Sequence, residues 1–248
     1  MPTQLARRLV KGAMRRYINL MDKVISRYVG GESSPAFFDA NRTYPQLLNI
    51  DANYQQIRGE LAALLPRTEA MGLVHETING HPEVKGWRVL YIYVRGMHRF
   101  PNQEHFPHTI AVLDSIPNVV DAWFSALEPG KSIPAHRGIY RGFLRYHTAF
   151  KVPASNPPRI RVKDEFYTWK EGESVMFDDR HEHEVYNESD ETRLVMIVDV
   201  MRPLPWFLHM FNVVAINFLR RMLIEPAIKG GSLGIKGDVW EAQRLAGV

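Results

Sequence analysis

Two histidine-bearing segments in the second half of the chain carry its most reactive combination of side chains. The first runs from His136 to His147 and includes Arg145, and the second spans residues 177–186 and is followed by Arg193. Imidazole binds iron, copper, nickel and zinc, whereas a guanidinium group holds a carboxylate through two parallel charged hydrogen bonds. Separated histidines with nearby arginines are therefore typical of an enzyme in which a redox metal meets an acidic cosubstrate.

Strand alternation limits which of these side chains can converge. Arg145 and His147 are two residues apart, so they share one face of an extended segment. Arg193 and Asp199 likewise share a face of the last predicted strand. In the second segment His181 and His183 would also share a face if that segment is extended. Spacing alone therefore leaves either of these two histidines as the ligand.

The elements that must position these side chains are mostly β-strands. Short β-rich segments separated by turn clusters occupy residues 119–127, 142–151, 159–162, 165–169, 174–178, 183–187 and 192–200, and an aromatic and β-branched segment at 87–95 predicts one more strand. Many short strands at close spacing favour a sandwich or barrel. We predict a mainly β fold with flanking helices, a jelly roll of the cupin kind.

Four helical segments are predicted around this β core, at residues 7–27, 53–65, 109–115 and 206–224. The first has apolar residues on one side and mostly basic residues on the other. It suits either a helix packed on the catalytic domain with a solvated basic face or a helix on an anionic membrane surface. No aromatic platform or recognised binding module accompanies the charge, so we expect no nucleic-acid partner. The uncharged run at 206–219 is too short to span a bilayer.

Composition restricts the chemistry further. The chain has 248 residues, 45% of them hydrophobic, which suffices for one sizeable core. It contains no cysteine, which excludes disulfides, thiolate metal sites and a cysteine nucleophile. The N-terminus lacks the pattern of a cleavable signal, so we expect a cytoplasmic protein, with the inner face of the membrane as an alternative place.

Three blocks of the sequence resemble a known family. They are Pro134-Ala-His136-Arg-Gly with Leu144-Arg145-Tyr-His147, then residues 172–185, and then residues 193–200 with Arg202-Pro203. They are similar to the aspartyl/asparaginyl β-hydroxylase family, whose members are iron(II)- and 2-oxoglutarate-dependent oxygenases on a double-stranded β-helix. The resemblance covers residues 45–203, and the spacings of His136 to Arg145 and of His183 to Arg193 match the family pattern.

The resemblance implies roles for individual residues. His136 and His183 would be the iron ligands, so the family pattern selects His183 over His181. Arg193 would hold the distal carboxylate of 2-oxoglutarate. The other residues expected against this cosubstrate are Arg145, His147, Ser125 and Tyr93.

One position departs from the usual facial triad of two histidines and a carboxylate. The acid normally stands two residues after the first histidine, where this chain has Gly138. Some members of the family use water in its place, so the resemblance implies a metal site with two protein ligands. We interpret Asp178 and Asp179 as residues that orient ligands.

The sequence patterns predict the domain organisation, and the resemblance implies two substrate classes. Residues 1–30 would be a basic amphipathic helix, 31–203 the oxygenase domain with its β core at 119–201, and 204–248 an apolar helix with an irregular tail. One branch of the family hydroxylates aspartyl or asparaginyl residues or amino acids, and the other a fatty-acyl chain of a lipid. The two segments suited to peripheral membrane contact favour the lipid. A third hypothesis is a non-catalytic cupin-like protein that binds a small dianion.

Overall fold

The computed structural model describes residues 4–62, 64, 65, 68, 71–73, 85–97 and 103–224, with side chains from residue 12 to residue 222. The predictions for the tail at 225–248 and for the basic side chains Arg7, Arg8 and Lys11 lie outside these described parts.

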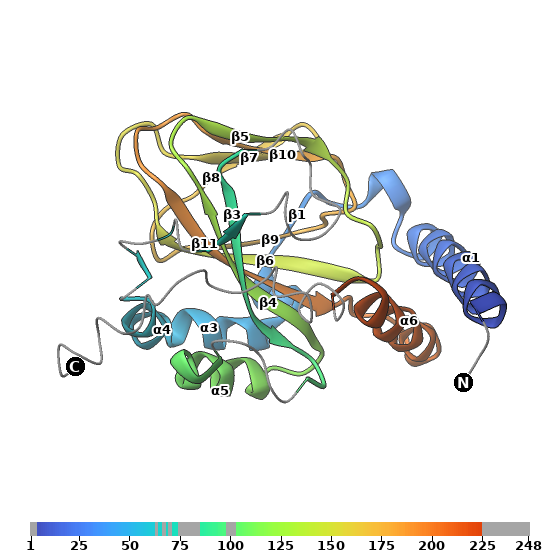
Figure 1. Cartoon of the computed structure of the whole chain (residues 1–248). Coiled ribbons are helices and arrows are strands. Elements are labelled where there is room, and N and C mark those ends of the chain that lie inside the picture. Colours follow the sequence, from blue (N-terminus) through green and yellow to red (C-terminus); the bar gives the residue numbers. More distant parts are fainter. Residues whose placement is uncertain are drawn as a thin grey trace.

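Two antiparallel sheets form the body of the molecule (Figure 1). The larger sheet has the order β1-β9-β6-β11-β4-β3-β2, with β1 Phe37–Phe38, β2 Gly72–Leu73, β3 Trp87–Val94, β4 Val119–Leu127, β6 Phe143–Lys151, β9 Ser174–Phe177 and β11 Arg193–Met201. The smaller has the order β5-β10-β7-β8, with β5 Lys131–His136, β7 Arg159–Val162, β8 Glu165–Thr168 and β10 His183–Asn187. This architecture confirms the predicted mainly β jelly roll.

The strands of the large sheet are buried on both faces, because each face packs against a different layer. On β4 and β11 every residue is buried. Side chains such as Trp123 and Ile197 point between the two sheets. Their neighbours Phe124 and Val198 point to the opposite face and pack with the helices. Alternation along one strand thus separates the residues of the interior cavity from those of the helix-covered core.

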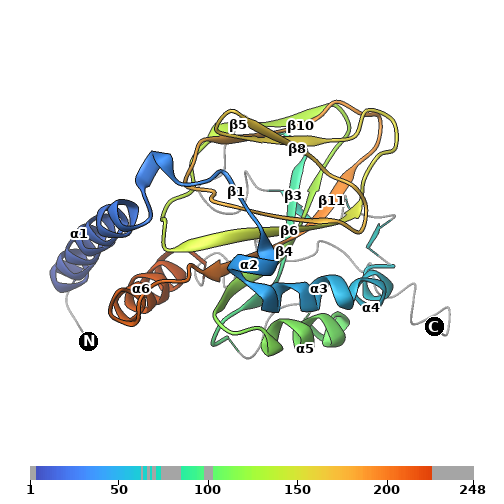
Figure 2. The ribbon, with the colours of Figure 1, turned by 180° about the vertical axis from the view of Figure 1, so that it is seen from behind.

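Helices cover the far face and one end of the large sheet. The helices are α1 Gln4–Tyr28, α2 Ala40–Thr43, α3 Leu48–Ala52, α4 Tyr54–Glu60, α5 Pro107–Ser115 and α6 Trp206–Leu219, with short turns η1 Gly31–Ser33, η2 Pro45–Leu47, η5 Gln103–His105 and η6 Arg220–Ile224. Helices α3, α4 and α5 lie beneath the sheet, and Figure 2 shows the same layer from behind. The predicted helix at 53–65 is realised as the shorter α4.

Helices α1 and α6 pack together at one end of the body (Figures 1 and 2). Ile18, Met21 and Ile25 of α1 share a hydrophobic cluster with Leu208 and Ile216 of α6. The Tyr17 hydroxyl donates a hydrogen bond to the carbonyl of Phe211 at 2.7 Å. In the described part of the chain no helix combines the length and the apolarity needed to cross a membrane.

Strand β5 is the longest strand that the sequence did not predict. It contains Pro134 and lies at the edge of the small sheet, where a missing backbone N–H leaves no ladder bond unmade. A proline in a mixed polar segment argues against a strand, but an edge strand tolerates proline. This strand matters because it ends at His136.

Candidate metal and cosubstrate site

A cavity of about 150 Å³ lies between the two sheets. The residues that line it are Trp87, Val89, Tyr91, Trp123, Ser125, Ile133, His136, Arg145, His147, Ile160, Phe177, His183, Val185, Arg193 and Ile197. Nine of these fifteen side chains are aliphatic or aromatic, and the other six are histidines, arginines and one serine. The cavity is therefore an apolar chamber with a few convergent polar groups, which is the usual form of a small-molecule site.

His136 and His183 come together where β5 ends and β10 begins. They are directly opposite one another in the strand pairing, and their ring centroids are 4.1 Å apart. The Nδ1–H of His136 donates to the carbonyl of Pro134 at 2.8 Å, and that of His183 donates to the carbonyl of His181 at 2.9 Å. A carbonyl can only accept, so these contacts define the tautomers and make Nε2 the unprotonated nitrogen of both rings, the one able to ligate a metal ion.

Burial keeps His183 in the form that binds a metal. Its side chain is almost completely buried, and burial together with the nearby His136 lowers the pKa of His183 to about 3. A neutral imidazole is the form that ligates a metal ion.

His181 has a different place in the structure. It is fully buried outside the cavity lining, where its Nε2 contacts Ser34 Oγ at 2.9 Å and lies 3.9 Å from Asp178. The segment before β10 bends, so the two histidines do not share a strand face. The geometry therefore places His183, and not His181, beside His136.

The side chain of Asp179 fills the space beside Gly138, the position where the usual third ligand would stand. A Cβ on Gly138 would overlap the carboxylate of Asp179, and the Gly138 N–H donates to the Asp179 carbonyl at 2.7 Å. Burial raises the pKa of Asp179 to about 7, although Arg145 acts to lower it. Among the described residues, no group of three or more His, Cys, Asp or Glu side chains is arranged to hold a metal ion.

Arg193 is a buried cation without a carboxylate partner within the described part of the chain. Its side chain is 1% exposed, its Nε has no hydrogen-bond partner, and its guanidinium lies 4.9 Å from the centroid of the Trp169 ring. Burial lowers the pKa of Arg193 to about 9, which expresses the free energy needed to hold an isolated charge there. A bound carboxylate would remove this penalty.

Arg145 lines the same cavity but is already paired. Its Nε and Nη2 donate to the two oxygens of Asp199 at 2.8 and 2.9 Å, and Asp179 lies 3.3 Å away. Burial would lower the pKa of Arg145, but these two carboxylates raise it above its ordinary value. The sequence offered two arginines for an acidic cosubstrate, and the structure leaves only Arg193 with an unmatched charge.

His147 and Ser125 complete the polar lining. His147 is buried with both ring nitrogens lacking a hydrogen-bond partner, and its ring stacks 5.9 Å from Trp169. Ser125 is buried and accepts a hydrogen bond from Trp87 Nε1 at 3.0 Å. Unmet buried polar atoms are rare in folded proteins, so the nitrogens of His147 indicate a place for a polar ligand.

The structure does not bring Tyr93 into the cavity. Trp87, Val89 and Tyr91 of β3 face the chamber, but an extra residue at Ile92 forms a β-bulge, so Tyr91 pairs with Trp123 and Tyr93 with Ala122. Tyr93 then packs on the opposite, helix-covered core. The prediction that Tyr93 lies in the cavity is therefore wrong, and Tyr91 lines it instead, because a bulge shifts the alternation by one residue.

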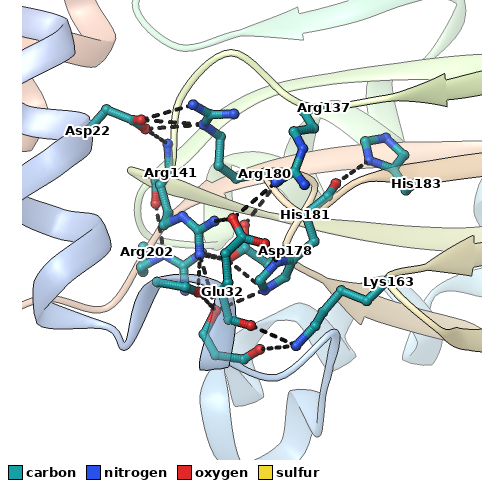
Figure 3. A network of polar contacts seen from close by, with 12 residues as sticks. Asp22, Glu32, Arg137, Arg141, Lys163, Asp178, Arg180, His181, His183 and Arg202 are labelled. Carbon is teal, nitrogen blue, oxygen red and sulfur yellow. Dashed lines mark hydrogen bonds and ion pairs between the residues drawn. The ribbon is translucent and has the colours of Figure 1, made fainter.

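A buried polar network supports the segment that carries His183 (Figure 3). Asp178 is fully buried and forms ion pairs with Arg141 at 3.3 Å and with Arg202 at 2.7 Å. Arg141 also donates to the Gly31 carbonyl at 2.7 Å, and its backbone N–H donates to Asp22 of α1 at 2.8 Å. The network thus connects α1 to the segments beside both histidines. The sequence did not indicate that Arg141 and Arg202 belong to such a network.

The fold and the site define a class before any comparison is made. A jelly roll whose interior holds two facing histidines and a lone buried arginine has the form of a jelly-roll enzyme with its site between the two sheets. A model of the family described as Aspartyl/Asparaginyl beta-hydroxylase matches residues 51–203. The chain belongs to this family, and it is a hydroxylase.

Individual relatives show how far the similarity extends. An ornithine lipid ester-linked acyl 2-hydroxylase of Rhizobium tropici is 33% identical over 202 residues, which cover 80% of this chain and 70% of that protein. The human aspartyl/asparaginyl beta-hydroxylase is 26% identical over 180 residues, covering 70% of this chain but only 23% of the human protein.

Solved structures of cupin domains resemble the β core more distantly. A cupin domain of a transcriptional regulator from Enterobacter cloacae is 13% identical, has a TM-score of 0.33 and covers 48% of this chain and 100% of that one. A predicted oxalate decarboxylase from Thermotoga maritima is 14% identical, with a TM-score of 0.30, covering 48% and 95% of the two chains. The strand order described above, and not these scores, defines the jelly roll.

Proposed function

We propose that this protein is an iron(II)- and 2-oxoglutarate-dependent hydroxylase that acts on a fatty-acyl chain of a membrane lipid. The observation that carries the proposal is the combination of His136 and His183, 4.1 Å apart between ring centroids, with the unpaired Arg193 in one cavity. A metal held through two imidazoles suits an iron site, and a lone buried guanidinium suits the free carboxylate of a bidentate ligand.

The residues present fit both groups. The Nδ1 atoms of His136 and His183 are engaged with carbonyls, so both rings are held with Nε2 as the ligating atom. In that arrangement iron would supply the activation of O2. The overall reaction consumes 2-oxoglutarate, O2 and a C–H group and produces succinate, carbon dioxide and an alcohol.

The chain's own residues would bind and orient the cosubstrate. Arg193 would hold the distal carboxylate, and the unmet nitrogens of His147 and the hydroxyl of Ser125 would contact the same molecule. Arg145, fully paired with Asp199 and Asp179, would shape the cavity instead of neutralising the dianion. The aromatic and aliphatic walls would exclude water from the reacting atoms.

Two observations favour an acyl chain over an aspartyl or asparaginyl side chain. The remaining cavity wall is apolar, with residues such as Ile133, Ile160 and Val185, and it offers no second unpaired cation for a substrate carboxylate among the lining residues. The relative from Rhizobium tropici is by name a lipid acyl 2-hydroxylase. A lipid substrate implies peripheral contact with a membrane, and we place the protein at its cytoplasmic face.

The test compares the protein with its His183→Ala variant. The native protein, supplied with iron(II), ascorbate and 2-oxoglutarate, is expected to form succinate, and the variant is expected to lose that activity and its metal binding together. Mass spectrometry of lipids and peptides from cells with and without the protein should then show a gain of one oxygen on lipids. A gain of one oxygen on aspartyl or asparaginyl peptides instead would overturn the lipid assignment. The absence of succinate in this assay from native protein that has bound metal would overturn the proposed chemistry.

A further inference from the structure

Helix α6 has an apolar face that nothing in the described chain covers. Leu208, Asn212, Ala215 and Ile216 point inward and are buried. The opposite face is formed by Trp206, Phe207, Met210, Phe211 and Val214, all exposed, with Trp206 at 76%. Their spacing places them along one side of the helix. Large exposed apolar patches of this kind mark interaction sites.

The neighbouring helix α1 adds positive charge beside this apolar face. Arg15, Arg16, Lys23 and Arg27 are exposed on α1. The one acidic residue of α1, Asp22, is turned toward the protein, where it pairs with Arg180 at 3.2 Å. Helix α6 contains no acidic residue at all. The two helices therefore present aromatic and basic side chains without an opposing exposed carboxylate of their own.

This combination fits an anionic lipid surface better than a second copy of the chain. A face shared by two copies would bring two sets of like charges together, which opposes association. A helix with aromatic and aliphatic residues on one side, accompanied by basic residues, lies at the boundary between lipid headgroups and acyl chains. Basic residues near such a surface each add to the attraction.

We propose that the outer faces of α1 and α6 form a docking surface for an anionic lipid bilayer. The proposal rests on the proposed function, because it explains how the site reaches an acyl chain, and it names the membrane contact and its chemistry. Trp206, Phe207 and Phe211 insert among the acyl chains, and the arginines of α1 contact lipid phosphates.

Docking in this way brings the end of the jelly roll that carries His136 and His183 to the membrane. Asp22 of α1 accepts hydrogen bonds from the backbone of Arg141 and from the side chain of Arg180 (Figure 3). Arg141 lies in the connection that follows His136, and Arg180 lies three residues before His183. The docking helix is therefore fastened to the same loops that carry the two metal-binding histidines.

The test measures flotation of the full chain with vesicles of phosphatidylcholine alone and of phosphatidylcholine mixed with phosphatidylglycerol. We expect binding to the anionic vesicles, weaker binding to the neutral ones, and loss of binding at high salt. The double variant Phe207→Asp/Phe211→Asp should weaken binding by at least about tenfold. The double variant Arg15→Glu/Arg16→Glu should reduce only the preference for anionic vesicles.

Phe166→Asp is the matched control, because Phe166 is 57% exposed on β8 of the small sheet, away from both helices. It should float like the native protein. Equal loss in this control, or no vesicle binding by the native chain, would overturn the proposal. A dimer in solution that the Phe207→Asp/Phe211→Asp variant dissociates, without vesicle binding, would assign the face to a second copy instead.

Succinate formation separates the two proposals, and binding of nickel(II) and 2-oxoglutarate is measured in every variant as a control. These variants lie outside the cavity, so ligand binding should stay unchanged and report correct folding. Vesicle binding without succinate formation would leave the docking surface standing while the proposed function fails. Succinate formation without vesicle binding would support the proposed oxygenase chemistry and overturn the docking surface.

Discussion

Two buried arginines in one cavity differ in whether carboxylates accompany them, and this difference assigns their roles. Arg145 faces Asp199 and Asp179, whereas Arg193 faces the indole of Trp169. A buried charge that lacks a partner lowers stability, while a paired one is close to neutral. A buried arginine without a carboxylate partner is expected where a ligand supplies the missing negative charge. The comparison explains why, of the two arginines, only Arg193 is expected to bind the cosubstrate.

The first prediction concerns Arg193→Met, which keeps an unbranched, flexible side chain and removes the charge. The variant should lose the rise in Tm that 2-oxoglutarate causes in the nickel-loaded native protein. Without ligand it should be at least as stable as the native protein, because an uncompensated buried charge has been removed. Differential scanning fluorimetry with and without 2-oxoglutarate measures both effects.

Arg159→Met is the control for Arg193→Met. Arg159 lies on the small sheet, where it pairs with Glu188 at 3.2 Å and its side chain is 42% exposed. This variant should keep the response to 2-oxoglutarate and change the free energy of unfolding by less than about 1 kcal/mol. An unchanged ligand response in Arg193→Met would contradict the role given to that residue.

The second prediction concerns the buried acid Asp121. It lies opposite Asp199 in the pairing of β4 with β11, and its Oδ1 has no hydrogen-bond partner. Burial and the neighbouring Asp199 raise the pKa of Asp121 well above its ordinary value. A raised pKa means that the folded state binds the proton more tightly than the unfolded state. Stability is therefore lost as the pH rises above the unfolded pKa of about 4.

Asp121→Asn should accordingly be more stable than the native protein at neutral pH, and the difference should shrink toward about pH 4. Each kcal/mol gained in the free energy of unfolding corresponds to a rise of about 2–4 °C in Tm for a chain of this size. Urea unfolding across this pH range measures the effect, with the exposed Asp190→Asn as control. A difference that grows on acidification would have the wrong sign for this explanation.

At the scale of elements, the bend between β9 and β10 is the segment on which the proposed metal site depends most. It has few backbone ladder bonds of its own, and instead it is held by Asp178 with two guanidinium groups and by His181 with Ser34. The His181 carbonyl in turn accepts the Nδ1–H of His183. Contacts behind a ligand that fix its ring in this way contribute strongly to metal affinity.

The third prediction is that Asp178→Asn loosens this segment. The free energy of unfolding should fall by about 3–5 kcal/mol, because two buried guanidinium groups lose their shared carboxylate. Nickel(II) affinity of the remaining folded protein should fall about 10- to 100-fold. Chemical denaturation and isothermal titration calorimetry measure the two effects.

Two further variants keep this prediction testable. Ser34→Ala removes the contact to His181 and the hydroxyl's contacts with the Gly31 carbonyl and Arg141, but it leaves the Asp178 ion pairs in place. It should remain folded, with a smaller loss of nickel(II) affinity in the same direction. Asp39→Asn alters an exposed pair with Arg42 and retains a side chain suited to the N-terminus of α2, so neither quantity should change. Unchanged metal affinity in both Asp178→Asn and Ser34→Ala would remove the positioning role of the network.

At the scale of the whole molecule, α1 is part of the folded body and not an appended tail. It buries Ile18, Met21 and Ile25 against the residues around α6, and Asp22 connects it to Arg141 and Arg180. A helix fastened in this way cannot be removed to test membrane binding without disturbing the catalytic body. Point substitutions on its exposed side are therefore the sound experiment.

The fourth prediction is that a fragment of residues 31–248 is much less stable than the full chain. Burying a large aliphatic side chain contributes about 1.5–3 kcal/mol, and three such residues are lost together with the Asp22 contacts. The fragment should unfold at a clearly lower temperature or aggregate, as thermal scanning and light scattering would show. Arg27→Ala, an exposed change on the same helix, should leave the unfolding temperature unaltered. A fragment with the full chain's Tm would show that α1 is dispensable.

Much of the fold could be predicted from sequence because strand periodicity is local. The predicted segments 119–127, 159–162 and 183–187 coincide with β4, β7 and β10. The spacings of His136 to Arg145 and of His183 to Arg193 carried the family resemblance, and the glycine at position 138 led to the prediction of a two-histidine site. These features depend on residue type and on neighbours a few positions away.

Only the tertiary structure decided which of these side chains remain available for a ligand. Asp199 meets Arg145 because β11 pairs with β6 in one register, and Tyr91 replaces Tyr93 in the cavity because one residue bulges out of β3. His181 leaves the cavity because a bend precedes β10. Each outcome depends on partners far away in the chain or on a single irregular residue. A linear pattern cannot specify either, since charge pairing and burial arise only when distant strands meet.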